Sequence, residues 1–184
     1  MPNIERNARF IKAMLERRGV TVSMLRVAGA PAVVLGELRA PGRRPTIGIY
    51  AHYDGQPVDS TQWLSPPFSP AVRAPNGTAI DWEAAGSFDP EWRIYARSAS
   101  DDKVPIEATM VALDALRASR TPLSVNLKFM FEGEEEAGSI HLAQIAERHA
   151  DVLAAEIWLL CDGPVHQSGN MQVFFGTRGE PTSR

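Results

Sequence analysis

The chain has 184 residues, of which 44% are hydrophobic and 22% are charged, and its formal net charge is −3. These values are typical of one globular domain or of a large piece of one. No long block is basic, so we do not expect a nucleic-acid partner. We find no signal peptide, and no apolar run approaches the roughly 20 residues of a membrane span. We therefore expect a cytoplasmic protein without membrane contact.

Helical and extended patterns alternate along the chain. Helical spacing of apolar residues predicts a first helix over residues 4–18, and β-branched runs then predict strands. The apolar run 46–51 is typical of a strand that is buried on both faces. The elements that follow the first helix are strands over 20–27, 32–38, 46–51 and 93–96, a helix over 103–119, a strand over 123–131, a helix over 139–149, and strands over 156–161 and 171–175. This alternation predicts an α/β fold with a mixed sheet flanked by helices.

Residues 55–91 differ from their surroundings because proline and aromatic residues gather there. A loop of this length inside a compact domain is more often functional than idle. Its aromatic residues predict that it packs rather than moves freely; in and just after it are Trp63, Phe68, Trp82 and Trp92. Two interpretations stay open, the wall of a substrate cleft and simple loop packing.

His52 and Asp54 directly follow the strand predicted over 46–51. A histidine at the carboxyl end of a strand in an open α/β sheet lies where such folds bind ligands. Asp54 can accept the second N–H of the imidazole ring, which leaves the other nitrogen free for a metal. A histidine that only hydrogen-bonds a turn capped by Asp54 is equally consistent with this fragment.

Two acidic motifs lie between a predicted strand and a predicted helix. Asp101 and Asp102 precede the helix over 103–119, where acids ordinarily cap the helix. The alternative is one carboxylate that bridges two metal ions, while its neighbour and Lys103 hold the turn. Residues 132–136 carry four acids that repel one another unless a divalent cation is bound. One glutamate can then ligate metal while the next takes a proton from water.

Asp162 also follows an apolar strand directly. A lone Asp before Gly163-Pro164 is usually a turn residue, but four such positions at one sheet edge together indicate a metal centre. The single cysteine, Cys161, is expected to be a buried small apolar residue rather than a catalytic thiol. A two-carboxylate glycosidase gives no reason for the His52-x-Asp54 pattern, and a calcium loop needs alternate acids with a central Gly.

The order of these motifs resembles the co-catalytic di-zinc metallopeptidase family of carnosinases, bacterial dipeptidases, glutamate carboxypeptidase, aminoacylase, and acetylornithine and succinyl-diaminopimelate deacylases. The likeness spans about residues 4–179 and rests on His52-Tyr53-Asp54, Ala96-Arg97-Ser98-Ala99-Ser100-Asp101-Asp102-Lys103, Glu132-Gly133-Glu134-Glu135-Glu136-Ala137-Gly138-Ser139 and Asp162. Residues 52–58, with Trp63 and Pro67-Phe68, resemble the dipeptidase and carnosinase branch. The resemblance implies the N-terminal portion of a zinc-exopeptidase catalytic domain.

The resemblance also implies a role for each motif. One metal ion would be held by His52, Asp101 and Asp162, and a second by Asp101 and Glu136. Asp54 would orient the His52 ring, and Glu135 would be the general base for a water that bridges the ions. The ions would be two zinc ions, with cobalt or manganese as alternatives, and the Asp101-Asp102 peptide would be cis. The substrate would be a small peptide or an N-acyl amino acid, and the full-length form is a candidate homodimer.

Two departures from the family pattern are local. Ala96-Arg97-Ser98 stands where the family usually has Gly-Arg-Gly, and Val104 stands where a Gly commonly follows the Lys. We interpret both as subfamily variation, since the small residues Ala96 and Ser98 occupy the two glycine positions and Val104 enters a helix.

The third departure is length, because family members are more than twice as long. We expect residues 1–176 to be part of the catalytic domain and residues 177–184 to begin the connection to a lid domain that is absent. The last His ligand is then missing: His141 and His149 are expected on the surface, and His166 is the outside candidate. A truncated chain of this kind would expose an apolar seam, bind metal weakly and hydrolyse little. The alternative is a catalytically silent remnant that acts as a folding or interaction module.

Overall fold

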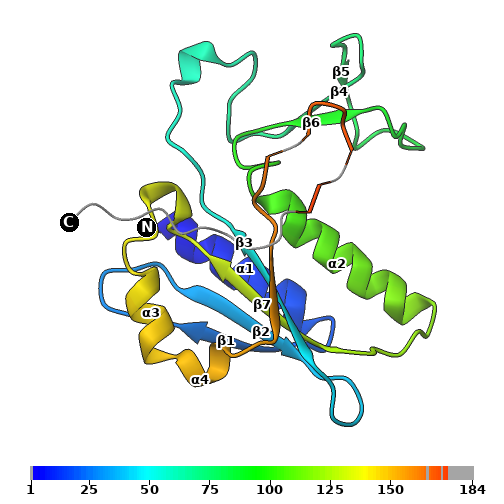
Figure 1. The fold of residues 1–184 in the computed structure, drawn as a ribbon. Coiled ribbons are helices and arrows are strands. Elements are labelled where there is room, and N and C mark those ends of the chain that lie inside the picture. Colours follow the sequence, from blue (N-terminus) through cyan, green and yellow to red (C-terminus); the bar gives the residue numbers. More distant parts are fainter. Residues whose placement is uncertain (1, 165, 171, 174–184) are drawn as a thin grey trace.

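The computed structural model describes residues 2–164, 166–170 and 172–173. Its main sheet has the strand order β1-β2-β7-β3-β8, with β1 Thr21–Leu25, β2 Val33–Leu38, β7 Asn126–Glu132, β3 Thr46–His52 and β8 Ile157–Leu160 (Figure 1). The β1–β2 and β2–β7 pairs are antiparallel, whereas β3 pairs in parallel with both β7 and β8. The expected α/β class with a mixed sheet is therefore confirmed.

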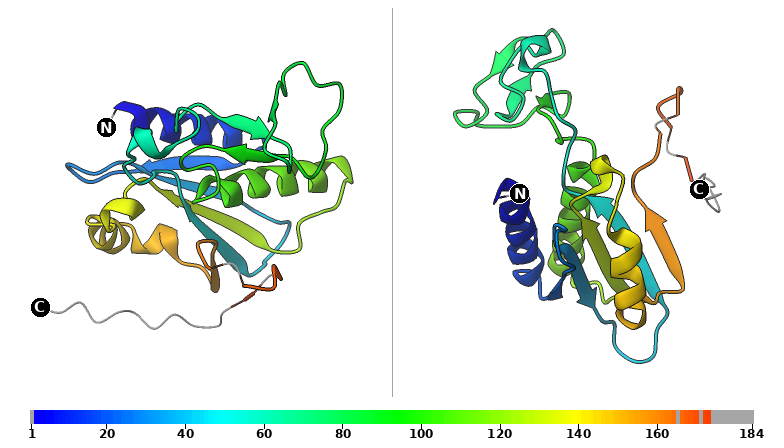
Figure 2. Two further views of the ribbon diagram at one scale, coloured as in Figure 1. Left: turned by 90° about the horizontal axis from the view of Figure 1, so that it is seen from above. Right: turned by 90° about the vertical axis from the view of Figure 1, so that its left-hand side faces the viewer.

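Helices cover both faces of this sheet. Helices α1, Pro2–Glu16, and α2, Lys103–Ala118, lie on one face, and α3, Leu142–Arg148, and α4, Ala150–Leu153, lie on the other (Figure 2). The two outer layers explain why β7 is apolar at successive positions, since residues that alternate between faces are buried on both. None of the helices in the described residues is long and apolar enough to cross a membrane.

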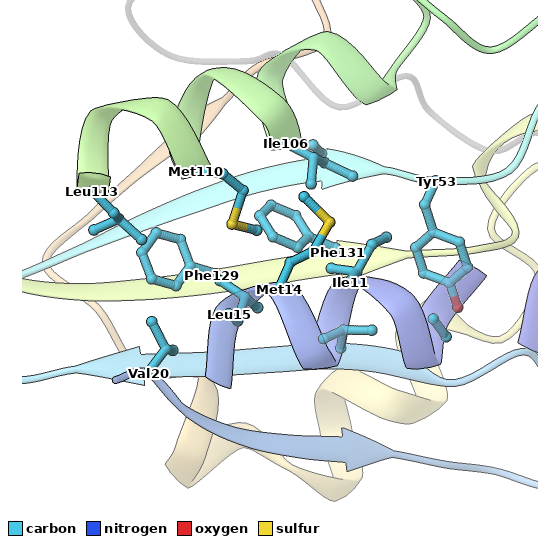
Figure 3. Close-up of a cluster of buried hydrophobic side chains, with 13 residues drawn as sticks. Ile11, Met14, Leu15, Val20, Tyr53, Ile106, Met110, Leu113, Phe129 and Phe131 are labelled. Atoms are coloured by element: carbon cyan, nitrogen blue, oxygen red, sulfur yellow. The ribbon is translucent and has the colours of Figure 1, made fainter. Parts of the chain in front are cut away.

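The larger core lies between α1, α2 and the sheet (Figure 3). Phe129 and Phe131 of β7 are fully buried there, against Leu15 of α1 and Met110 of α2. Burial of each such side chain contributes roughly 1.5–3 kcal/mol relative to exposure. This packing holds the ends of β3 and β7 in place beneath the loops that follow them.

Residues 55–96, which we call the arm, extend from the carboxyl end of β3 and stand away from the layers (Figure 2). The arm contains a 3₁₀ turn, η1 Ser60–Gln62, and a separate antiparallel sheet of β4 Ala71–Arg73, β5 Ala79–Ile80 and β6 Arg93–Tyr95. The loop expected over 55–91 thus contains two short strands, and the strand expected over 93–96 is observed as β6.

The expected packing of the arm's aromatic residues is only partly correct. Trp63 and Trp92 are half-buried, but Phe68 and Trp82 are 68% and 43% exposed. Strands of two or three residues present too little surface to bury such side chains, so the prediction of a packed loop is wrong for these two residues.

Several predicted boundaries also move. Strand β7 begins at Asn126, whose side chain accepts from Ala40 N (3.0 Å) and donates to Arg44 O (2.9 Å), and so fixes the start of the strand. The helix expected over 139–149 is shorter and is followed by α4, because Ser139 has a left-handed φ of 50° and the residues after it form a turn. Most of the strand expected over 171–175 lies outside the described residues.

An apolar seam lies on β8, the edge strand of the main sheet in the part of the chain that the structure describes. Ile157, Leu159 and Leu160 are 57%, 47% and 56% exposed. The seam therefore presents apolar side chains on both faces of this strand, since successive side chains alternate.

Candidate metal centre

The sequence motifs meet at one edge of the main sheet. His52 is the last residue of β3, Asp162 follows β8 closely, and Glu135 begins the 3₁₀ turn η2, Glu135–Ala137, after β7. These three strands are parallel, so their carboxyl ends lie side by side (Figure 1). Asp101 joins them from the turn that leads into α2.

Three side chains converge closely enough to share a metal ion. Ligand atoms of His52, Asp101 and Asp162 all lie within 4.8 Å of one another. The Nε2 atom of His52 is 3.0 Å from Asp101 Oδ1 and 3.8 Å from Asp162 Oδ2. His52 is buried, whereas both carboxylates are open to solvent, so a ligand can approach from the acidic side.

Asp54 holds the His52 ring and also bonds to the acidic turn after β7. Its Oδ1 atom is 3.2 Å from His52 Nδ1, which assigns the ring proton to Nδ1 and leaves Nε2 facing Asp101. Its Oδ2 atom accepts a hydrogen bond from the backbone N of Glu136 at 3.1 Å. One buried carboxylate therefore connects the end of β3 to the acidic turn.

This donor set fits a divalent metal ion. An imidazole nitrogen and carboxylate oxygens suit zinc, and also cobalt or manganese. Burial opposes protonation of His52, but the surrounding carboxylates of Asp54, Asp102, Glu135 and Asp162 raise its pKa above the ordinary value. Such a concentration of negative charge around one imidazole favours a cation at Nε2.

The two glutamates expected to act from the acidic turn lie differently. Glu135 Oε2 is 3.8 Å from His52 Nε2, and burial together with the charges of Asp162 and Glu136 raises the pKa of Glu135, although His52 opposes this. Glu136 is outside the converging group. Its carboxylate accepts from the backbone N (3.2 Å) and the side-chain Nε2 (2.5 Å) of Gln56, a neighbour that the sequence motifs did not single out.

Two further acids are buried beneath the site. Asp102 is 3% exposed, and burial raises its pKa to about 7, while its Oδ2 atom accepts from the backbone N of His52 at 3.1 Å. Glu132 is 2% exposed and accepts from the hydroxyls of Tyr50 and Ser139, and burial raises its pKa as well. Their burial could not be read from a sequence in which acids adjoin a turn.

Gly55 and Ser98 fit together at the base of the arm. Ser98 stands at a position where the family usually has glycine, and its φ is 61°, in the region that glycine favours. A Cβ atom on Gly55 would lie 1.7 Å from Ser98 Oγ, so the serine requires a glycine opposite it.

The peptide bond between Asp101 and Asp102 is cis, as the resemblance implied.

The remaining histidines do not join the converging group. His141 is half-buried and its Nδ1 lies 2.9 Å from Glu134 Oε2, while the Nε2 of His149 is buried without a hydrogen-bond partner among the described residues. Both were expected on the surface, and the structure places them there only in part, since each is half-buried. His166 is exposed and pairs with Ser168 (2.6 Å).

Cys161 is half-buried rather than fully buried. Burial raises the pKa of its thiol, and its Sγ contacts the backbone O of Leu159. A thiol with a raised pKa is a poor nucleophile, so the expectation that Cys161 is not catalytic fits this environment.

Comparison with known proteins decides the family. The model of peptidase family M20/M25/M40 matches residues 48–176. The chain belongs to this family. The human Beta-Ala-His dipeptidase is 31% identical over 159 residues, which cover 81% of this chain and 27% of that protein. The chain thus spans about a quarter of the length of this curated M20 relative.

Solved structures of M20 peptidases agree with the fold. Human carnosine dipeptidase 1 superposes with a TM-score of 0.68 at 28% identity, covering 89% of this chain and 34% of that chain. The M20 family metallo-carboxypeptidase of Sulfolobus solfataricus gives a TM-score of 0.72 at 31% identity, covering 90% and 34%. The expected resemblance to the metallopeptidases of this family, through an N-terminal part of their chain, is confirmed.

Proposed function

We propose that this chain supplies the metal-binding and proton-transfer part of a hydrolase that cleaves a peptide or amide bond in a dipeptide-like or N-acyl amino acid substrate. The observation that carries the proposal is the convergence of His52, Asp101 and Asp162, with Glu135 beside them. A buried imidazole ringed by carboxylates is a functional arrangement rather than a stabilising one, since like charges at close range oppose folding.

Two divalent ions fit the residues of this edge. His52, Asp101 and Asp162 would hold the first ion, and Asp101 and Glu136 would contribute to the second. Ions of this kind, when bound, polarise a scissile carbonyl and make water more acidic. Asp54 supports the first position by holding the His52 ring, and Gln56 supports Glu136 by donating to both of its oxygens.

Glu135 is proposed as the general base. The pKa of Glu135 is raised towards neutral pH, and a group with a pKa near the working pH both accepts and returns protons efficiently. Glu135 would take a proton from the attacking water and deliver it to the leaving amine. Its side chain is 35% exposed beside the buried His52, so the carboxylate is open to water and substrate on one side.

The substrate class is supported by the relatives' names. One relative is a dipeptidase for Beta-Ala-His, and one solved neighbour is a carboxypeptidase, so both act at the end of a peptide. Both of these proteins have longer chains than this one, so a dipeptide-like or N-acyl amino acid substrate is proposed here as a class and not as a single compound.

The test uses a panel of dipeptides and N-acyl amino acids, assayed with zinc, cobalt or manganese. Glu135→Gln should reduce turnover by about 10²–10⁴-fold, the usual contribution of a general base. Its affinity for zinc, measured by calorimetry, should stay close to that of the unmodified chain. Glu147→Gln, an exposed acid on α3, is the matched control and should leave both quantities unchanged.

Two outcomes separate this proposal from the alternative of a silent module. Turnover that is not reduced in Glu135→Gln would show that Glu135 is not the general base. Tight zinc binding by the unmodified chain without hydrolysis of any substrate would favour a silent module.

A further inference from the structure

The backbone N–H of His52 has an unusual acceptor. Strand β8 pairs with β3 only as far as Tyr50 and Leu160, and the next bond on that side runs from Cys161 N to Tyr50 O at 3.0 Å. Backbone groups of alternate residues point to the same neighbouring strand, so His52 N faces the side where β8 has ended. There it donates to Asp102 Oδ2 at 3.1 Å.

Asp102 is not used as a helix cap. It stands at the N-cap position of α2, yet its side chain makes no capping hydrogen bond. Capping was the ordinary explanation of an acid before this helix, and it does not describe what this carboxylate does. The carboxylate instead replaces the missing strand acceptor at the end of β3.

The hydrogen bond from His52 N to Asp102 Oδ2 is buried, so breaking it is costly. His52 is 1% exposed and Asp102 is 3% exposed. A buried N–H without an acceptor is costly, and so is a buried carboxylate without a donor. Helix α2 follows Asp102 immediately and packs Ile106 and Met110 into the core, so both ends of the contact are anchored.

Asp101, the neighbour of Asp102, is anchored much less firmly. Its side chain is 59% exposed, and its carboxylate Oδ1 lies 3.0 Å from His52 Nε2. The backbone position of Asp101 relative to the imidazole therefore depends on what holds the next residue.

We propose that Asp102 is a positioning residue that sets the Asp101 carboxylate against His52 by accepting the His52 backbone N–H. The proposal deepens the proposed function and rests on it, because the geometry matters only if His52 and Asp101 share a metal ion. Partners of this outer kind typically change metal affinity by about 10–100-fold when they are removed.

The experiment compares zinc and cobalt binding in the unmodified chain and three variants. Asp102→Ala removes the acceptor and should weaken binding by about 10–100-fold, with a changed visible absorption spectrum of bound cobalt. Asp102→Asn keeps an acceptor oxygen but removes the charge, and should bind close to the unmodified chain. Asp114→Ala, which removes an exposed acid of α2, is the matched control.

The outcomes separate this inference from the proposed function. Unchanged zinc affinity in Asp102→Ala overturns the inference, and so does an Asn variant as weak as the Ala variant, because charge would then explain the loss. If circular dichroism shows that Asp102→Ala does not fold, Asp102→Ser replaces it in the same titration, and unchanged zinc affinity in that variant likewise overturns the inference. An unmodified chain that binds neither metal overturns the proposed function, and the inference with it.

Discussion

The main sheet and the arm use the same residue types with opposite results. Phe129 and Phe131 of β7 are fully buried, whereas Phe68 and Phe88 of the arm are 68% and 70% exposed. In β7 each ring enters a space between the sheet and a helix layer, while the arm offers short strands and turns. Apolar side chains therefore stabilise this protein only where a second layer covers them.

The difference also separates the two regions by role. The converging residues His52, Asp101 and Asp162 lie at strand ends or in a turn tied to the buried framework, where packing restricts their movement. Positions on rigid elements hold a ligand geometry better than positions on loops. The arm joins this framework at Gly55 and Ser98, so the junction is where the two regions constrain each other.

The largest effect is expected in the framework. Phe131→Ala should lower the free energy of unfolding by about 3–5 kcal/mol, because it removes a fully buried ring and leaves a cavity. Urea denaturation followed by circular dichroism measures this, with an unchanged m-value as the check on two-state behaviour. A loss below about 1 kcal/mol would mean that the core between α1, α2 and β7 is not packed as described.

An intermediate effect is expected at the junction. Gly55→Ala should destabilise the chain by about 1–3 kcal/mol, because the added methyl group overlaps Ser98 Oγ. Ser98→Gly should remove most of this cost in the double variant, since it clears the space and relieves the positive φ. A double-mutant cycle in urea measures the coupling, and strictly additive effects would show that the two residues do not oppose each other.

The smallest effect is expected in the arm. Phe88→Ala, the same substitution as in β7, should change the free energy of unfolding by less than about 1 kcal/mol, since what is lost is mainly an edge contact with Trp92. The same urea titration applies. A loss as large as that of Phe131→Ala would show that the arm is covered by a partner layer under the assay conditions.

Much of the framework followed from the sequence. Periodicity placed the helix over 103–119 and the buried strand over 46–51 close to the observed α2 and β3. The reason is that the number of buried faces determines which positions along the sequence are apolar. Boundaries moved where side-chain bonds or a positive φ decided them, as at Asn126 and Ser139. Exposure of the arm was not predictable, since aromatic content says nothing about whether a second layer is present.

For the site, the sequence by itself determined which residue types end each strand, and hence that His52, Asp54, Asp101, Glu135, Glu136 and Asp162 gather at one edge. Only the tertiary structure decided their relations. It brings Asp101 and Asp162 to His52, leaves Glu136 with Gln56, and assigns Asp102 to the His52 backbone instead of a helix cap. The reason is physical: order along the chain fixes the edge, but hydrogen-bond partners depend on where a neighbouring strand ends and which groups lose contact with water.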